Sequence, residues 1–519
     1  MTNAQGQGEL PRTFPTVVHM LADAAARSPD RIALVCGEKS LTYVQYLRRV
    51  AGFARELTRH GRGARVALVC GNSLDLPIAM FAAHAAGAQA VPINPAYTGR
   101  ELSYILSDAD PSAIVYDAGA AASVEPVLAS LQIGHDVRIG SIGGRTLDIW
   151  KDDATQSLPS LPQPAELATL QYTGGTTGRP KGVNITHGQM AINISQREAA
   201  LPTHADDEAI LCMMPLFHVF AVAMCLHLSA YCRGRLIIMP RYHPGAVLDL
   251  IEREKITRLP AGPTVFIGLL NHEKFRATGF SSLRTCYSGS APLPEEALQR
   301  WQEETGTPIL EGYGQTEAGP VLTYVREGAE VKAGSSGPAL PLTDIEIVDV
   351  ETGTKVLAVG ELGEIRARGP QIMSGYRNKP QETAEALRDG WLYTGDIGEL
   401  DADGYLYIRD RKKDMAIVGG FNVYPREVDE VLFAHPAVLE AAATGVPDSY
   451  YGETIRACVV LREGANLQLD DLLAHCRTSL AKYKVPTEIR IVQALPRTTI
   501  GKIDRIALRD WLSSKRGEA

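Results

Sequence analysis

The sequence predicts an α/β protein with a large N-terminal domain, made of α/β subdomains with parallel-rich sheets and a small β-barrel-like subdomain, followed by an α+β C-terminal domain. Short apolar runs such as RVALVC (65–70) and RLIIM (235–239) alternate with helical patterns such as residues 44–59. This alternation is typical of parallel sheets covered by helices. Between residues 344 and 410 the pattern changes to short strands separated by turns, which favours an antiparallel or barrel-like subdomain.

A charged cluster, RDRKKD at residues 409–414, marks the predicted domain boundary. After it an α+β pattern resumes, with a helix expected to begin at Pro425 and a strand expected near residues 457–461. The net charge also changes sign there, from acidic before Arg411 to slightly basic after it. We therefore place an N-terminal domain at residues 1–410 and a C-terminal domain at residues 411–519.

The composition excludes several classes of protein. The chain has 519 residues, 45% hydrophobic and 22% charged, with a formal net charge of −8. These values are those of a globular protein and argue against a general nucleic-acid binder, which usually carries a basic excess. The eight cysteines include no CxxC pair, so a zinc site or a disulfide framework is not expected, and a reducing compartment fits. The start, MTNAQGQGEL, lacks the pattern of a signal peptide, which favours a cytoplasmic location.

One uncharged stretch lies between Glu208 and Arg233. It is longer than the ~20 apolar residues that span a bilayer. It contains Pro215, His218 and His227 and has no second span beside it. We therefore predict a buried helix in a large core and no transmembrane segment.

The strongest local pattern is YTGGTTGRPKG at residues 172–182, which follows a predicted strand, ATLQY. Glycines let backbone N–H groups approach an anion, threonines add hydroxyl donors and Lys181 adds charge, which together suit a polyphosphate. The pattern differs from a Walker A loop because Pro180 precedes Lys181 and no Ser or Thr follows it. A surface turn would explain the glycines but not three threonines and a lysine together.

Three weaker patterns follow along the chain. EGYGQTE (311–317) offers an aromatic face, a hydroxyl and a carboxylate, which suit purine stacking, a phosphate hydrogen bond and a hard cation. YTGD (393–396) places a carboxylate after a glycine turn, and PRTTIGKIDR (496–505) places a lysine on a glycine-containing loop. Taken singly, each of the three is a common turn or a solvated charge.

Together the four patterns resemble, in order and rough spacing, the adenylate-forming superfamily of acyl-CoA synthetases, peptide-synthetase adenylation domains and firefly-type luciferases. The resemblance runs from about Phe14 to Trp511 and includes PLFH (215–218), SGSAPLP (288–294) and GFNVYP (420–425). The last run and the preceding KKDM look most like bacterial fatty-acid and related carboxylate CoA ligases. The resemblance implies activation of a carboxylate with Mg·ATP to an acyl-adenylate and pyrophosphate, followed by acyl transfer to the thiol of CoA.

The resemblance also implies roles for individual residues. Glu317 would hold Mg²⁺, Asp396 and Arg411 would bind ribose, and Lys502 would bridge the carboxylate and the α-phosphate. Catalytic roles are implied for Thr173, Lys181, His218, Glu317 and Lys502. Contacts with ATP or AMP are implied for Thr173, Gly174, Gly175, Thr176, Thr177, Gly178, Lys181, Ser288, Gly289, Ser290, Ala291, Pro292, Glu311, Gly312, Tyr313, Gly314, Gln315, Thr316, Asp396, Ile408, Arg411 and Lys502.

The second half-reaction is expected to use a rotated, mobile C-terminal domain, with Lys413 as the hinge. CoA contacts are implied for Gly419, Gly420 and Phe421. The residues implied for the acyl pocket are His218, Val219, Phe220, Met224, Gly262, Thr264 and Gly314. Most of these are apolar or small, which favours a medium- or long-chain fatty, alicyclic or aromatic monocarboxylate over a dicarboxylate.

Departures from the superfamily pattern bear on the alternatives. Luciferases carry a lysine where this chain has Ile417, which argues against luciferase-type oxidation. Amino-acid adenylation domains hold the substrate ammonium with an aspartate in a region that here, at residues 219–224, contains no acid. A buried ammonium without a counter-charge is costly. Loading of a carrier-protein phosphopantetheine stays open, because that arm presents the same thiol as CoA.

Protein partners are the last expectation. The loop around Lys502 resembles the lysine-acetylation sites of bacterial acyl-CoA synthetases, which implies a protein lysine acetyltransferase and a deacylase as partners. Acetylation would remove the charge that the adenylation step needs. The sequence leaves both a monomer and a homodimer open.

Overall fold

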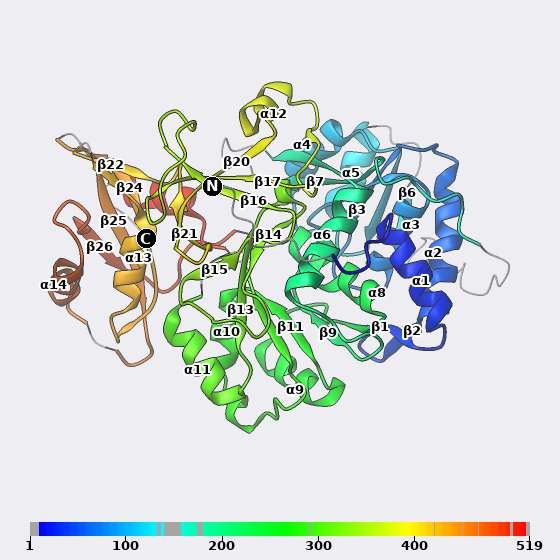
Figure 1. Ribbon diagram of the computed structural model, residues 1–519, viewed down its shortest axis with the longest axis horizontal. Coiled ribbons are helices and arrows are strands. Elements are labelled where there is room, and N and C mark those ends of the chain that lie inside the picture. Colours follow the sequence, from blue (N-terminus) through cyan, green and yellow to red (C-terminus); the bar gives the residue numbers. More distant parts are fainter. Residues whose placement is uncertain are drawn as a thin grey trace. The chain divides into compact units, whose positions relative to one another are not determined.

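The computed structural model describes residues 10–131, 136–139, 157–173, 180–289, 291, 293–419, 421–448, 450–465, 467–498 and 502–514. The chain divides into two compact units. Unit 1 comprises Met1–Ile345 and Ala367–Tyr393, and unit 2 comprises Glu346–Arg366 and Thr394–Ala519. The described strands form four sheets (Figure 1).

The first sheet of unit 1 has eight strands. In spatial order they are β14 (Val321–Tyr324), β13 (Ile309–Gly314), β12 (Thr285–Ser288), β11 (Arg258–Ala261), β9 (Ala209–Cys212), β10 (Arg235–Ile238), β1 (Ile32–Cys36) and β2 (Lys39–Thr42). The pairs from β13 to β1 are parallel, and the two edge strands are antiparallel to their neighbours. The short β15 (Ser335–Pro338) is anchored to β14, because the Thr323 hydroxyl donates to the carbonyl of Ser336 over 2.8 Å.

The second sheet of unit 1 has seven strands. They are β18 (Gly375–Tyr376), β8 (Lys181–Thr186), β7 (Leu167–Thr173), β4 (Gln89–Pro92), β3 (Arg65–Val69), β5 (Ala113–Asp117) and β6 (Asp136–Ile139). The strands from β7 to β6 run parallel, whereas β8 forms an antiparallel hairpin with β7 and β18 adds to the free edge of β8.

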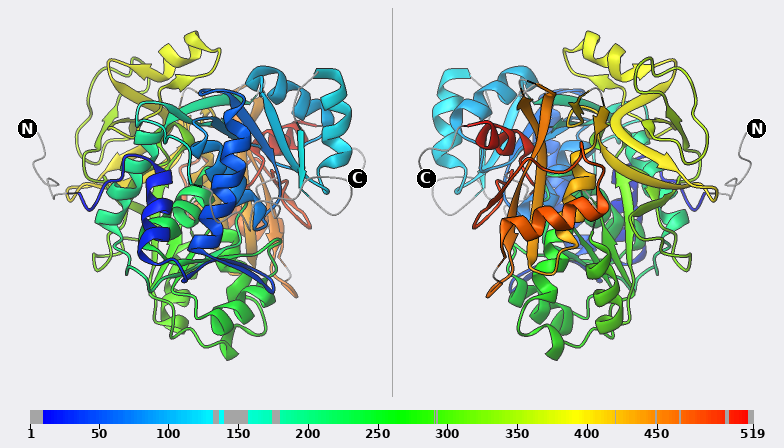
Figure 2. Two further views of the ribbon diagram at one scale, coloured as in Figure 1. Left: turned by 90° about the vertical axis from the view of Figure 1, so that its right-hand side faces the viewer. Right: turned by 90° about the vertical axis from the view of Figure 1, so that its left-hand side faces the viewer.

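The largest core of unit 1 lies between these two sheets. The helices that contribute to it are α1 (Val17–Arg27), α2 (Tyr43–Thr58), α3 (Asp75–Ala85), α6 (His187–Ala200), α7 (Val219–Ala221), the π-helix η2 (Val222–His227) and α8 (Leu228–Cys232). In α3, every residue after Asp75 is buried, as expected for a helix that is apolar on all sides. In Figure 2 the blue helices α1 and α2 cover one side of this unit.

Other helices cover the outer faces of the two sheets. A second core around Trp301 joins the eight-stranded sheet to α9 (Pro244–Glu254), α10 (Pro263–Leu270), η3 (Phe275–Ala277) and α11 (Glu295–Thr305). A third core joins the seven-stranded sheet to α4 (Gly99–Ala109) and α5 (Ala121–Leu131). The short α12 (Pro380–Ala386) and β19 (Leu387–Arg388) complete unit 1 with η4 (Thr316–Ala318).

Unit 2 contains two largely antiparallel sheets. The first has the order β21 (Tyr405–Arg411), β20 (Trp391–Leu400), β17 (Gly363–Arg368) and β16 (Asp344–Val348). The second has the order β23 (Phe421–Val423), β22 (Ala416–Val418), β25 (Gly452–Leu461) and β24 (Val438–Asp448), with β26 (Glu488–Ile491) parallel to β25.

Successive side chains of β24 point to opposite faces of its sheet, and a different set of helices packs on each face. Ala441 and Ala443 belong to the core that contains α13 (Pro425–Phe433) and α14 (Leu469–Ser479). The intervening Ala442 belongs to a smaller core with α15 (Arg505–Ser513). The second sheet is therefore covered on both faces.

These observations confirm the predicted fold class. The expected strands at 65–70, 235–239 and 457–461 and the expected helices at 44–59 and 425 are all present. The eight cysteines are free thiols. The uncharged stretch begins with the strand β9, which the sequence analysis did not predict there, and continues as the mostly buried α7–η2–α8 segment, which confirms the predicted buried helix for this second part. Among the described residues, no helix is long and apolar enough to cross a membrane. The boundary at residue 410 stays a prediction.

Candidate active site

The carboxyl ends of β11, β12 and β13 bring the predicted adenine-binding residues to one edge of unit 1. Ser288 ends β12 and pairs with Ala261 of β11 and with Glu311 of β13. The Glu311 carboxylate accepts a hydrogen bond from the backbone N–H of Leu293 over 3.0 Å, which ties the SGSAPLP segment to the EGYGQTE segment. Ligands bind at this edge of parallel sheets in α/β proteins.

Two glycines at this edge allow aromatic rings to approach the backbone. A Cβ atom on Gly289 would lie 2.9 Å from Cε2 of Phe220, and one on Gly312 would overlap the ring of Tyr324. Glycine is therefore required at both positions for the observed packing. The contact at Gly289 also places the predicted acyl-pocket residue Phe220 beside the predicted adenine site.

The loop that carries His218 connects the two sheets of unit 1. The amide of Gln171 in β7 donates to the carbonyl of Phe217 over 3.0 Å. His218 caps the start of α7, where its Nδ1 accepts from the N–H of Phe220 over 3.3 Å. The hydrogen bond from Gln171 therefore links the loop of His218 to β7, which carries the predicted phosphate ligand Thr173.

The phosphate hairpin is formed by β7 and β8. Thr173 is the last residue of β7 and stands directly opposite Lys181, the first residue of β8. The intervening predicted phosphate ligands, Gly174–Gly178, lie outside the described residues. The Lys181 ammonium lies 5.0 Å from the centre of the Tyr376 ring, within the range of a cation–π contact.

Glu317 lies in η4, directly after β13. The Tyr376 hydroxyl donates to its Oε1 over 2.9 Å. Burial raises the pKa of Tyr376 well above its ordinary value, and the neighbouring Glu317 carboxylate raises it further. Lys181, Tyr376 and Glu317 thus form a connected set that combines a cation, a hydroxyl donor and a carboxylate.

The residues at this place fit a magnesium ion that is shared with a nucleotide. In the described part of the chain there is no group of three or more His, Cys, Asp or Glu side chains that could hold a metal. Mg²⁺ needs no such cage, since it is usually bound by one or two carboxylates together with substrate phosphates and waters. Glu317 would supply that carboxylate.

Unit 2 gathers the predicted ribose ligands and the predicted catalytic lysine. Asp396 in β20 and Arg411 in β21 are cross-strand partners, and Arg411 Nε lies 3.1 Å from Asp396 Oδ1. Ile408 pairs with Gly398 on the same two strands. Burial lowers the pKa of Lys502 to about 8, with the Arg411 cation lowering it further and Asp396 opposing the shift.

The predicted CoA and hinge residues also lie in unit 2. Gly419 adopts a positive φ of 57° and donates its N–H to the carbonyl of Tyr451 over 2.9 Å. The Phe421 ring is exposed and stacks on Tyr483, with 4.7 Å between centroids. Lys413 is exposed on the turn that follows β21.

Comparison with known proteins identifies the family. Residues 21–377 match the AMP-binding enzyme family, and residues 427–502 match the C-terminal domain of AMP-binding enzymes. The chain belongs to the AMP-binding enzyme family.

The relatives of this AMP-binding enzyme cover nearly all of its length. It is 38% identical to a long-chain-fatty-acid–CoA ligase of Bacillus subtilis (strain 168), over 96% of this chain and 94% of the relative. It is 38% identical to a feruloyl-CoA synthase of Amycolatopsis sp, over 92% and 95%. The crystal structure of ATP-bound MatB from Rhodopseudomonas palustris is similar with a TM-score of 0.90 and 31% identity, over 96% and 99%. The protein is an ATP-dependent, AMP-forming ligase.

The remaining predicted residues of the AMP-binding enzyme fall into two groups. Ser290, Pro292 and Gly420 lie outside the described residues. The others are described at or near the sheet edge of unit 1: Met224 is fully buried, Gly262 precedes α10 and approaches the carbonyl of Gly289, and Gly314 ends β13. Val219 begins α7, and Thr264 lies in the first turn of α10. Tyr313 lies in β13, and Ala291 lies between β12 and α11. Gln315 and Thr316 directly precede Glu317 in the sequence.

Tyr376, which contacts two predicted site residues of the AMP-binding enzyme, was not singled out by the sequence analysis. It lies 59 residues after Glu317 in the chain and in a strand of only two residues. No spacing or periodicity links the two positions, because their contact depends on β18 joining the edge of a distant hairpin.

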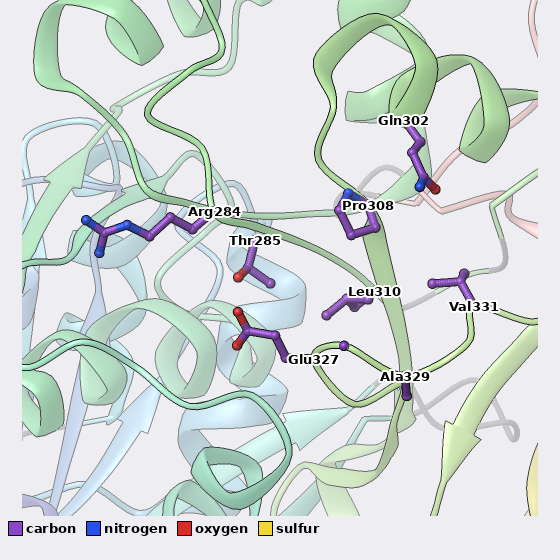
Figure 3. Close-up of a pocket in the computed structure, with 9 residues that line it drawn as sticks. Arg284, Thr285, Gln302, Pro308, Leu310, Glu327, Ala329 and Val331 are labelled. Carbon is purple, nitrogen blue, oxygen red and sulfur yellow. The ribbon is translucent and has the colours of Figure 1, made fainter.

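A separate pocket of about 370 Å³ lies at the other ends of the same strands (Figure 3). Thr285, at the start of β12, and Leu310, near the start of β13, line it together with Glu327. It contains none of the predicted site residues. The pocket is therefore distinct from the candidate active site.

Proposed function

We propose that this AMP-binding enzyme is an acyl-CoA synthetase that joins an apolar monocarboxylate to CoA, with a fatty, alicyclic or aromatic acid as substrate. The observation that carries the proposal is the contact between Phe220 and Gly289. It sets the apolar segment 219–224, which contains no acidic residue, directly beside the sheet edge that would hold the adenylate. An uncharged acyl group would meet no unpaired carboxylate there, whereas a substrate ammonium would find no counter-charge.

In the first half-reaction, a carboxylate oxygen attacks the α-phosphorus of ATP, and the bond to the β-phosphate oxygen breaks, so that acyl-adenylate and pyrophosphate form. Both reactants are anions, and the main task of the protein is to position them and neutralise their charge. Lys181 would neutralise the departing phosphates, and Glu317 would hold Mg²⁺, which neutralises phosphate charge when bound. Lys502 would bridge the carboxylate and the α-phosphate.

In the second half-reaction, the CoA thiol loses its proton to solvent and the thiolate attacks the activated carbonyl. The bond between the carbonyl carbon and the phosphate oxygen breaks, and AMP leaves with the electrons of that bond. We assign the CoA contacts to Gly419, Gly420 and Phe421. The positive φ of Gly419 and the exposed Phe421 ring suit close approach of a ligand to the backbone. His218 would lie at the mouth of the acyl pocket.

The names of the relatives support the same activity. They include a long-chain-fatty-acid–CoA ligase and a feruloyl-CoA synthase, and an anthranilate CoA ligase of known structure that is 28% identical with a TM-score of 0.89. Both aliphatic and aromatic acids are thus represented among them. The choice between these acids belongs to the experiment.

A panel of acids tests the proposal. Purified protein with Mg·ATP is mixed with octanoate, palmitate, cyclohexanecarboxylate, benzoate, ferulate, malonate or leucine, and pyrophosphate release and CoA-dependent AMP formation are measured. We expect both signals with at least one apolar monocarboxylate and neither with malonate or leucine. Pyrophosphate release without any acyl-CoA would instead favour a carrier-protein thiol as the acceptor. No release with any of these acids would contradict the proposal.

A further inference from the structure

Tyr376 is held firmly in place by the backbone around it. Its strand, β18, pairs with β8 so that Tyr376 stands opposite Val183, two residues from Lys181. The Tyr376 N–H donates to the Thr383 hydroxyl over 2.9 Å. The ring therefore has a fixed origin beside the phosphate hairpin.

The same segment contacts Glu317 twice. The Tyr376 hydroxyl donates to Glu317 Oε1 over 2.9 Å, and the N–H of Met373 donates to the Glu317 carbonyl, also over 2.9 Å. The bond from Met373 restrains the backbone of Glu317, and the bond from Tyr376 restrains the orientation of its carboxylate. A phenol is well suited to this task because it adds no charge to the site.

The ring of Tyr376 contacts the other charged member of the site. The Lys181 ammonium lies 5.0 Å from the ring centroid, where the negative face of an aromatic ring attracts a cation. One side chain thus touches both the carboxylate that would hold a cation and the lysine that would contact phosphates.

We propose that Tyr376 is a positioning residue that orients Glu317 for the divalent cation and, through its ring, holds Lys181 beside it. This inference rests on the proposed function and adds a residue to it. Partners that hydrogen-bond a metal ligand fix the direction of its lone pairs, and their loss typically costs about 10- to 100-fold in metal affinity. The loss of the Tyr376 hydroxyl should therefore weaken cation binding while leaving the fold intact.

Direct cation binding is the first readout. The full-length protein with the ATP analogue α,β-methylene-ATP is titrated with Mn²⁺, and bound Mn²⁺ is measured by electron paramagnetic resonance. We expect Tyr376→Phe, which keeps the ring, to weaken Mn²⁺ binding about 10- to 100-fold. Tyr376→Leu, which also removes the contact with Lys181, should in addition weaken binding of the analogue.

Tyr116→Phe is the matched control. The Tyr116 hydroxyl in β5 donates to Glu125 in α5 over 3.4 Å, so this variant also loses a tyrosine–glutamate hydrogen bond in unit 1, away from the site. Its Mn²⁺ affinity should equal that of the wild type. Melting curves of all variants check that they fold.

A double-mutant cycle separates positioning from general support of the structure. If Tyr376 acts through Glu317, then Tyr376→Phe should cost less than about 2-fold in Mn²⁺ affinity in a Glu317→Gln background. Equal Mn²⁺ binding by Tyr376→Phe and the wild type would overturn the inference. So would an equal cost in both backgrounds, or the absence of Mn²⁺ binding by the wild type with the analogue. Failure of the proposed function would appear separately, as wild-type protein that binds Mn²⁺ and nucleotide but makes no acyl-adenylate.

Discussion

At Lys502 two requirements oppose each other. The proposed role needs a charged ammonium, because only a cation offsets the repulsion between a carboxylate and a phosphate. Burial and the Arg411 cation favour the neutral amine, and the pKa is lowered to about 8. Both the loss of the Lys502 ammonium and its deprotonation at high pH should therefore lower the rate of adenylation.

Removal of the ammonium should abolish the first half-reaction only. We expect Lys502→Ala to lower acyl-adenylate formation by at least about 100-fold, as for loss of a major electrostatic contact in a transition state. Thioester formation from supplied acyl-adenylate and CoA should stay within a few-fold of the wild type. Lys502→Gln, which imitates acetylated lysine, should behave like Lys502→Ala. An equal loss of both half-reactions would contradict the assignment.

The pH profile of adenylation should report the same group. Because the active form is protonated, activity should be full below the pKa of Lys502 and should fall as the pH rises through about 8. The kcat/KM for adenylation, measured between pH 6.5 and 9.5, reports groups of the free enzyme. Arginine stays charged throughout this range, so the residual activity of Lys502→Arg should not show this decline. A wild-type profile that stays flat to pH 9.5 would count against the role.

At the scale of elements, three helices of unit 1 meet at buried histidines. His84 of α3, His187 of α6 and His227 of η2 are at most 2% exposed, and the ring of His84 lies 5.4 Å from that of His187 and 6.2 Å from that of His227. Burial lowers the pKa of all three, that of His187 to about 3, and each neighbouring imidazole adds to the effect. The packing of these helices therefore requires neutral imidazoles.

This requirement predicts that acid weakens unit 1. The unfolded chain takes up protons near pH 6.5 whereas the folded histidines do not, so stability is full above about pH 6.5 and falls as the pH drops toward 3. Each histidine should lower the free energy of unfolding by about 1.4 kcal/mol between pH 7.5 and pH 5.5. Denaturant midpoints at pH 7.5 and pH 5.5 measure the loss. In His227→Phe, about one third of the pH-dependent loss should disappear; an unchanged loss would refute this account.

The predictability of an element depended on whether its signal was local. The amphipathic helix α2 was predicted to within a residue, since its apolar face repeats at helical spacing and Thr42 and Gln45 form a capping box. The strands β3 and β10 were visible as apolar β-branched runs. By contrast, β18 has two residues and gains its conformation from pairing with β8. For the same reason the sequence indicated Glu317 and Lys181 but not Tyr376, which joins them.

At the scale of the whole molecule, the order of the chain does not follow the order of the units. The chain leaves unit 1 after Ile345, returns at Ala367 and leaves again after Tyr393. The sequence motifs fall into the same two units, but they did not predict that the chain passes between the units more than once. The motifs of unit 1 are those predicted to bind the phosphates, adenine and the acyl group, and the motifs of unit 2 are those predicted to bind ribose and CoA and to supply Lys502.

Two chemistries that use different faces of one small domain require that domain to rotate, and we predict Lys413 as the hinge. Proline fixes φ near −65° and restricts the residue before it, so Lys413→Pro should trap one orientation. If the adenylating form is trapped, pyrophosphate release should persist while acyl-CoA formation falls by about 100-fold or more, because the domain can no longer rotate into the second orientation. The half-reactions are measured separately, with Lys413→Ala as the control that removes the charge but leaves φ free. Equal losses in both half-reactions, with a lowered melting temperature, would indicate a merely destabilised turn.

The addition of β18 to the edge of β8 also has a consequence during protein synthesis. The strand β18, the second partner of β8 beside β7, is encoded roughly 190 residues downstream. At about 5–20 residues per second the ribosome needs on the order of 10–40 s to reach it. Until then the nascent chain carries an uncovered strand edge, which is the kind of surface that pairs with other chains. The hydrogen bond between Tyr376 and Glu317 can form only when this delay ends. A polypeptide released before residue 375 would therefore leave the edge of β8 unpaired and Glu317 without its hydrogen bond from Tyr376. We expect such a truncated product to aggregate through the open strand edge rather than to act as a slower enzyme.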